Sequence, residues 1–170
     1  MIGGLAFALV FGRRKRSDEI IAGVLAAMRA WTGLIYHLMF FAPINKMAYA
    51  FAALFAIQVE AFGYVGVIQR RMTFGRSNCP EAWIGIALVL YAAVIYPLLG
   101  VAAGHEPAEL PAFGVTPCPV TIFTLGILLL TIRPFPRPLL IIPILWSLIG
   151  GSAAILLGVP QDWLLLASGS

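Results

Sequence analysis

A small set of side chains in this 170-residue sequence has the chemistry for catalysis or metal binding. His37, Cys118, Gln161 and Asp162 each lie near the same end of a neighbouring apolar run, and His105 lies in a connection at that end. Imidazole and thiolate are good ligands for soft metals. The sequence therefore predicts a ligand site where these side chains converge, with His37 and Cys118 as candidate metal ligands.

The order Thr116, Pro117, Cys118 is typical of a helix start, with Thr116 as a capping residue and Pro117 in the first turn. The positive end of the helix dipole would then favour a thiolate at Cys118. A plainer interpretation stays open, in which Cys118 is a small apolar filler and His37 a hydrogen-bonded residue near the membrane surface. No catalytic residue is assigned, and the cofactor is left unknown.

A second pair with chemical potential, Arg29 and Glu60, lies within apolar runs. Each is nine residues from the same end of its run, so as helices they would place both charges at the same depth, about 14 Å from one face. A charge in hydrocarbon needs a partner or a polar cavity. We expect Arg29 and Glu60 to form an ion pair or share a cavity. The pair would either fix the helix register or act as a proton or ion relay, which makes both residues candidates for ligand binding.

The composition indicates which elements must position these side chains. Hydrophobic residues make up 61% of the chain, charged residues 11%, and the mean hydropathy is +0.97. Soluble domains have about 25% charged residues. The apolar runs are long enough to cross a bilayer as helices and lack the alternation of a membrane barrel. The sequence predicts an all-α, polytopic membrane protein that forms a single transmembrane domain over 1–170.

We predict five complete spans, with a partial apolar helix at each terminus, so that the chain looks short at both ends. The spans are 20–42, 47–69, 83–103, 116–132 and 138–157, and the partial helices are 1–12 and 159–168.

Basic residues are concentrated in alternate connections between the runs. Nine Lys or Arg residues lie in 13–19, 70–81 and 133–137, against Lys46 alone in the other connections. Because positive residues favour the cytoplasmic side, we expect these three connections in the cytoplasm and the protein in a bacterial inner membrane. Cys79 and Cys118 would then lie on opposite faces and could not pair. The net charge of +4 follows from this arrangement and does not indicate nucleic-acid binding.

Five segments together resemble the bacterial integral membrane proteins grouped as domain of unknown function 6064. The resemblance implies a polytopic membrane protein without an assigned activity, and it supplies no catalytic residues. The matching segments are WTGLIYHLMFFAPIN (31–45), AYAFAALFAIQ (48–58), YPLLG (96–100), FGVTPCPVTIFTLG (113–126) and PILWSLIGGSAAILLGVPQD (143–162).

Two functions from different classes remain at this stage. One is a membrane protein that binds or moves a small molecule, ion or metal at a polar site between helices. The other is a structural or accessory subunit that packs against another membrane protein or a second copy. Small residues at four-residue spacing, such as Gly150, Ala154 and Gly158, suit close helix packing. An enzyme is disfavoured, since only Cys118 and His37 offer nucleophilic chemistry.

Overall fold

The computed structural model is built of helices, and it describes residues 2–12, 16–75, 77, 79–102, 114–132, 137–157 and 162–169. Extended pairing in these residues is limited to one isolated bridge, so the all-α prediction is confirmed for them. Several α-helices continue directly into wider π-helical turns. The elements are α1 (Ile2–Gly12), α2 (Ser17–Trp31), η1 (Thr32–Phe41), α3 (Ala48–Phe62), η2 (Gly63–Ile68), α4 (Pro80–Leu90), η3 (Tyr91–Ile95), α5 (Tyr96–Ala102), α6 (Pro117–Leu129), η4 (Arg137–Leu140), α7 (Ile141–Leu157) and α8 (Trp163–Ser168).

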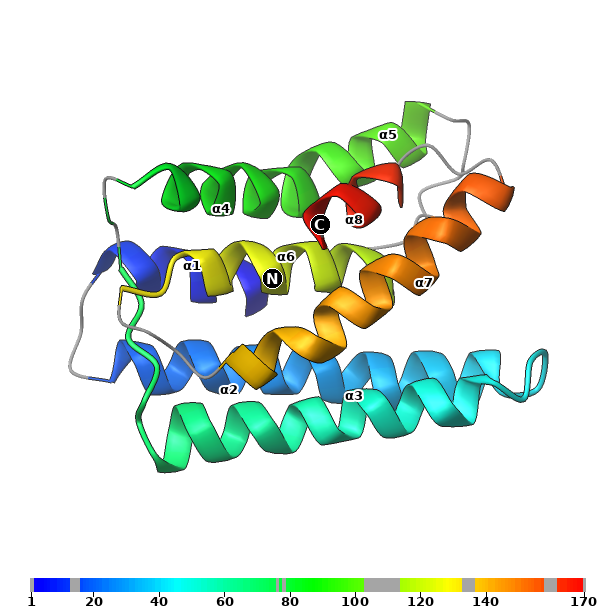
Figure 1. Ribbon diagram of the computed structural model, residues 1–170, viewed down its shortest axis with the longest axis horizontal. Helices are drawn as coiled ribbons and strands as arrows, with labels where there is room; N and C mark the ends of the chain where they lie inside the picture. Colours follow the sequence, from blue (N-terminus) through cyan, green and yellow to red (C-terminus); the bar gives the residue numbers. More distant parts are fainter. Residues whose placement is uncertain are drawn as a thin grey trace.

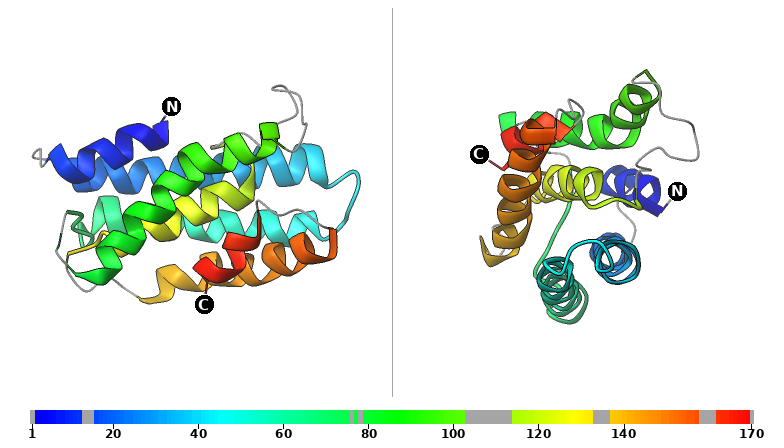
Figure 2. Two further views of the ribbon diagram at one scale, coloured as in Figure 1. Left: turned by 90° about the horizontal axis from the view of Figure 1, so that it is seen from above. Right: turned by 90° about the vertical axis from the view of Figure 1, so that its right-hand side faces the viewer.

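Helix α6 lies in the middle of the bundle. Figure 1 shows it between the α4–α5 pair and the α2–α3 pair, with α7 crossing obliquely, and the end-on view in Figure 2 shows neighbours around it. Helices α2, α4, α7 and α8 all pack against it. Every residue from Pro119 to Leu128 is buried. This helix therefore supplies the interior against which the other helices are arranged.

The prediction of five complete spans is not confirmed, because four helices have the length and composition to cross a membrane. They are Ser17–Phe41, Ala48–Ile68, Pro80–Val101 and Arg137–Ile155, among the described residues. The run 116–132 forms only the 13-residue α6, about 20 Å long, which falls short of roughly 30 Å of hydrocarbon. A helix surrounded by protein is as apolar as one surrounded by lipid, so its composition alone suggested a span.

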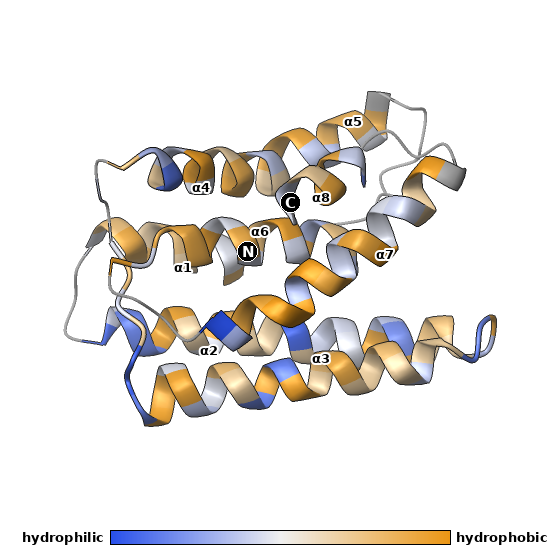
Figure 3. Ribbon diagram, in the orientation of Figure 1, coloured by the Kyte–Doolittle hydropathy of each residue, from blue (hydrophilic) through white to orange (hydrophobic). Residues whose placement is uncertain are grey.

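Residues 16–19, 70–75 and 131–132 lie at one end of the bundle, drawn at the left of Figure 1, where Figure 3 shows hydrophilic residues. Nε of Arg70 lies 3.1 Å from a carboxylate oxygen of Glu19. The Phe74 amide donates a 2.9 Å hydrogen bond to Asp18. Phe74 and Thr131 form the isolated antiparallel bridge, whose hydrogen bonds are made by their chain neighbours. Segments 16–19, 70–75 and 131–132 are thus joined to one another at this end.

Two glycines allow α4 and α6 to approach closely. A Cβ atom on Gly85 would lie 2.7 Å from the carbonyl oxygen of Gly126, and one on Gly126 would lie 2.8 Å from the carbonyl oxygen of Gly85. These distances are too short for any side chain. The contact fixes how α4, and α5 beyond it, are placed against the central helix.

The starts of α4 and α6 follow a common local pattern. Each begins with a proline after a residue in extended conformation, Cys79 before α4 and Thr116 before α6. Proline suits the first helical turn because that position has no intrahelical acceptor for an N–H group. The Thr116 side chain makes no capping hydrogen bond, whereas Pro117 lies in the first turn of α6 as expected. Both Cys79 and Cys118 are free thiols.

Candidate functional site

Arg29 is the most deeply enclosed charged residue of the described chain. It lies on the face of α2 turned toward the bundle, with no solvent-exposed surface. Its Nη1 donates a 2.8 Å hydrogen bond to the Thr121 hydroxyl of α6, and its Cζ lies 4.9 Å from the centre of the Phe55 ring. The Nε and Nη2 atoms have no hydrogen-bond partner among the described residues. A buried guanidinium is therefore held along one edge and left unpaired along the other.

Thr121 is fixed as an acceptor by its own helix. Its hydroxyl donates a 2.8 Å hydrogen bond to the carbonyl of Pro117, one turn earlier in α6. A hydroxyl has one proton and two lone pairs, so once that proton is used the oxygen can only accept. The Arg29 N–H groups can only donate. The polarity of this contact is thus set by the geometry of α6.

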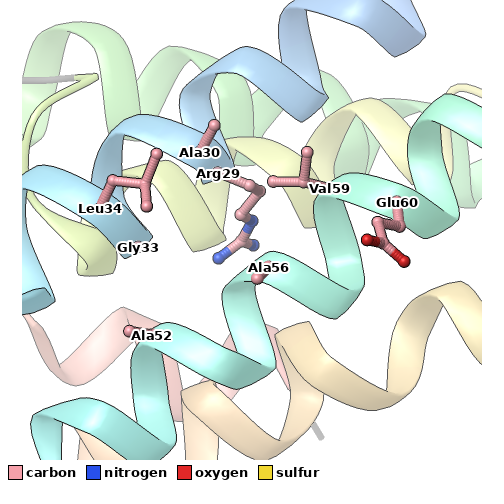
Figure 4. Close-up of a pocket in the computed structure, with 8 residues that line it drawn as sticks. All are labelled: Arg29, Ala30, Gly33, Leu34, Ala52, Ala56, Val59 and Glu60. Atoms are coloured by element: carbon pink, nitrogen blue, oxygen red, sulfur yellow. The ribbon is translucent and has the colours of Figure 1, made fainter.

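A cavity of about 180 Å³ lies beside Arg29, between α2–η1 and α3. Figure 4 shows the Arg29 side chain extending from α2 toward α3 in this space. Small residues on both helices leave the room. The lining residues are Arg29, Ala30, Gly33, Leu34, Ala52, Ala56, Val59 and Glu60.

Glu60 lines the same cavity as Arg29, from the α3 side (Figure 4). Its side chain is exposed on the surface of the bundle. No salt bridge joins the two residues; the salt bridge found among the described residues is the one between Arg70 and Glu19. The structure thus brings the two charges to one cavity without direct pairing.

A second polar cluster lies at the N-terminal end of α6, about one turn from Thr121. The Tyr96 hydroxyl donates a 2.5 Å hydrogen bond to Oδ1 of Asp162, and the Cys118 thiol lies close to this carboxylate. Burial raises the pKa of Asp162 above its ordinary value, while the interactions with Tyr96 and Cys118 oppose that rise. Two members of the predicted site, Cys118 and Asp162, therefore lie close together.

His37 makes no hydrogen bond to this cluster among the described residues and lies inside a cage of aromatic rings. It has no exposed surface, and its ring centre is 5.1 Å from that of Phe55 and 5.1 Å from that of Trp146. The rings of Phe41 and Phe51 are also within about 6 Å. Neither imidazole nitrogen has a hydrogen-bond partner among the described residues.

The metal hypothesis for His37 and Cys118 stays a prediction. Among the described residues, no group of three or more His, Cys, Asp or Glu side chains is arranged to hold a metal ion. Gln161 and His105, the remaining members of the predicted site, lie outside the residues that the structure describes.

The model of one protein family matches the whole chain. The match covers residues 1–170 and is to the family of unknown function DUF6064. The chain belongs to the DUF6064 family. No curated protein and no solved structure shows a detectable match to the chain.

The sequence did not single out several residues that organise the sites of this DUF6064 protein. Phe55, Tyr96 and Trp146 looked like ordinary apolar or interfacial residues, and nothing in their spacing linked them to Arg29 or Asp162. Thr121 offered a weak signal, as a polar residue in an otherwise apolar run. Its role depends on α6 being central, which the sequence alone did not reveal.

Proposed function

We propose that this DUF6064 protein is an integral membrane protein that binds a small anion, or the anionic group of a small molecule, in the cavity beside Arg29. The observation that carries the proposal is a fully buried guanidinium with two unpaired nitrogens next to a cavity of about 180 Å³. A buried charge without a counterion is strongly unfavourable. A bound anion would supply that counterion.

The geometry of the contacts around Arg29 supports a binding role over a purely structural one. A structural arginine is expected to be saturated by carboxylates or carbonyl groups of the protein. Within the part of the chain that the structure describes, Arg29 instead has one hydrogen bond, from Nη1, and one contact with an aromatic face. These contacts orient the side chain while leaving part of its hydrogen-bonding capacity for a ligand.

Binding can be tested by thermal unfolding of the detergent-purified protein, followed by fluorescence of its four tryptophans. Sodium salts of acetate, chloride, nitrate and phosphate would be compared at constant ionic strength. A ligand at one hundred times its dissociation constant should stabilise the fold by about 2.7 kcal/mol. The effect should disappear in Arg29→Gln and persist in Arg71→Gln, a matched change at an exposed arginine. Equal stabilisation of all three proteins would contradict the proposal.

We also propose that the end of the bundle with Arg70 and Arg71 faces the cytoplasm of a bacterial inner membrane. Arg16, Arg70 and Arg71 lie at this end, where segments 16–19 and 70–75 contact each other, and positive residues favour the cytoplasmic side. The test uses single cysteines at Lys46 or Arg71, both exposed, with both native cysteines replaced by serine. A membrane-impermeant maleimide added to intact cells should label Lys46→Cys alone. Labelling of Arg71→Cys alone would show the opposite orientation, with this end outside the cytoplasm.

A structural or accessory role, with another membrane protein or a second copy as partner, is the competing proposal. Purification in a mild detergent should separate the two. A stoichiometric partner together with no anion effect would favour the accessory role.

A further inference from the structure

We propose that the ligand at Arg29 is the carboxylate of a single-chain amphiphile, such as a fatty acid, that enters the cavity from the lipid between α2 and α3. This inference rests on the proposed function and names the chemical class of its ligand. It follows from which edge of the guanidinium is unpaired, from the charges that line the cavity, and from where the cavity opens.

The unpaired edge of Arg29 has the geometry of a carboxylate-binding fork. Nη1 bonds to Thr121, and Nε and Nη2 have no partner in the described segments. These two lie side by side in a planar guanidinium, with their N–H bonds nearly parallel. Such a pair matches the two oxygens of one carboxylate and gives two charge-assisted hydrogen bonds. A single round ion such as chloride would use this fork less well.

The charges around the cavity favour a ligand with one negative charge. Arg29 is the one basic residue among its eight lining residues, and Glu60 is the one acidic residue. A phosphate or sulfate dianion would place a second negative charge near Glu60 without a second cation to balance it. A monocarboxylate needs only Arg29. The side chain of Glu60 is itself a carboxylate. It would compete with the ligand for Arg29 or repel the ligand.

The remainder of the cavity suits an apolar chain. Its other lining residues are uncharged and apolar, mainly alanine and glycine. An apolar cavity of about 150 Å³ can hold benzene, so a space of about 180 Å³ has room for a carboxylate and a few methylene groups. Acetate alone would leave much of this volume unfilled.

The open side of the cavity lies on the surface of the bundle that would contact lipid. Leu34 is 56% exposed, and Ala56 and Glu60 are exposed as well. Helices α2–η1 and α3 belong to two of the candidate spans, so this rim lies within the hydrocarbon region if they cross the membrane. A chain longer than the cavity could therefore continue into the lipid.

The test is a binding series on the full protein in dodecyl maltoside, measured by calorimetry with acetate, butyrate, hexanoate and octanoate. Affinity should rise about fourfold for each methylene group that enters the cavity and then level off. Octanol, with a similar chain but no charge, should bind at least tenfold more weakly than octanoate. Glu60→Gln should bind octanoate several-fold more tightly than the wild type.

Two variants distinguish recognition by the paired nitrogens of Arg29 from simple charge attraction and from a loss of folding. Arg29→Lys keeps a buried cation but loses the fork, and it should weaken octanoate binding at least tenfold. Ala56→Leu fills the exposed rim with little expected effect on folding, and it should also weaken octanoate. Arg71→Lys is the control and should bind as the wild type does.

The possible outcomes distinguish this inference from the proposed function. If acetate or chloride binds as tightly as octanoate and binding requires Arg29, the cavity is an anion site but the amphiphile inference is wrong. If octanol and octanoate bind equally in wild type and Arg29→Lys, the carboxylate fork is refuted. If none of these anions binds, both proposals fail.

Discussion

The hydrogen bond between Arg29 and Thr121 can be tested by replacing Thr121 with valine, which has nearly the same shape. The variant loses two interactions, the bond received from Arg29 and the bond donated to the Pro117 carbonyl. Thr124 is a matched control because it is equally buried in α6 and donates the same kind of bond, 2.7 Å long, to Val120. The difference between Thr121→Val and Thr124→Val therefore isolates the contact with Arg29.

The expected size of that difference follows from the charge of the donor. Hydrogen bonds to charged groups contribute about 1.5–3 kcal/mol. Thr121→Val should thus be less stable than Thr124→Val by about 1.5–3 kcal/mol, or roughly 10- to 150-fold in the unfolding equilibrium. The measurement is reversible unfolding in mixed micelles of dodecyl maltoside and dodecyl sulfate, followed by tryptophan fluorescence.

Equal destabilisation by the two valine substitutions would refute the reasoning for Arg29. A double variant gives a further check. The extra loss of stability in Thr121→Val should arise because Nη1 of Arg29 is left without its hydrogen-bond acceptor. In that case, adding Thr121→Val to the Arg29→Met variant should lower stability no more than Thr124→Val lowers it in the wild type. A larger cost would mean that Thr121 stabilises α6 in some other way.

Three further predictions address other parts of the molecule. Gly85→Ala should be about 1–3 kcal/mol less stable than Gly23→Ala in the same unfolding assay, because a Cβ at Gly85 meets backbone whereas Gly23 has nothing within 4 Å; equal stabilities would refute the close contact. Burial raises the pKa of Asp162 above 3.8, so the folded protein binds this proton more tightly than the unfolded chain, and stability should fall as the pH rises from about 3.8 through the raised pKa. Asp162→Asn should flatten this dependence, and an unchanged pH profile would contradict it. His37→Phe should leave stability unchanged or raise it, since no described residue bonds to either ring nitrogen within the aromatic cage; loss of a bound metal on elemental analysis would instead support His37 as a ligand.

Hydropathy predicted the helical class well, and the charge pattern predicted that segments 16–19 and 70–75 lie at the same end. Long apolar runs and clustered arginines are local signals, and the structure has four long apolar helices with segments 16–19, 70–75 and 131–132 together at one end. The span expected at 116–132 is not confirmed, and this has a physical cause. Lipid and a protein interior select the same residues, so hydropathy does not distinguish a spanning helix from the enclosed helix α6.

The candidate sites were less predictable because they depend on which helix faces touch. Equal depth predicted that Arg29 and Glu60 could meet, and they share a cavity. The hydrogen-bond partner of Arg29 came instead from Thr121, on a helix whose central position was not foreseen. Pairing between distant helices depends on rotation about each helix axis, and a single sequence constrains that rotation weakly.

The contact between Arg29 and Thr121 joins residues 92 positions apart, and this has a consequence for biosynthesis. Ribosomes add roughly 5–20 residues per second, so α2 emerges about 5–18 s before the residue that holds its guanidinium. Until α6 arrives, α2 carries an unaccompanied cation that disfavours stable residence in the bilayer. Nascent chains that stop before residue 121 should therefore be retained at the insertion machinery or degraded. The unpaired Arg29 would in this way distinguish truncated chains from complete ones.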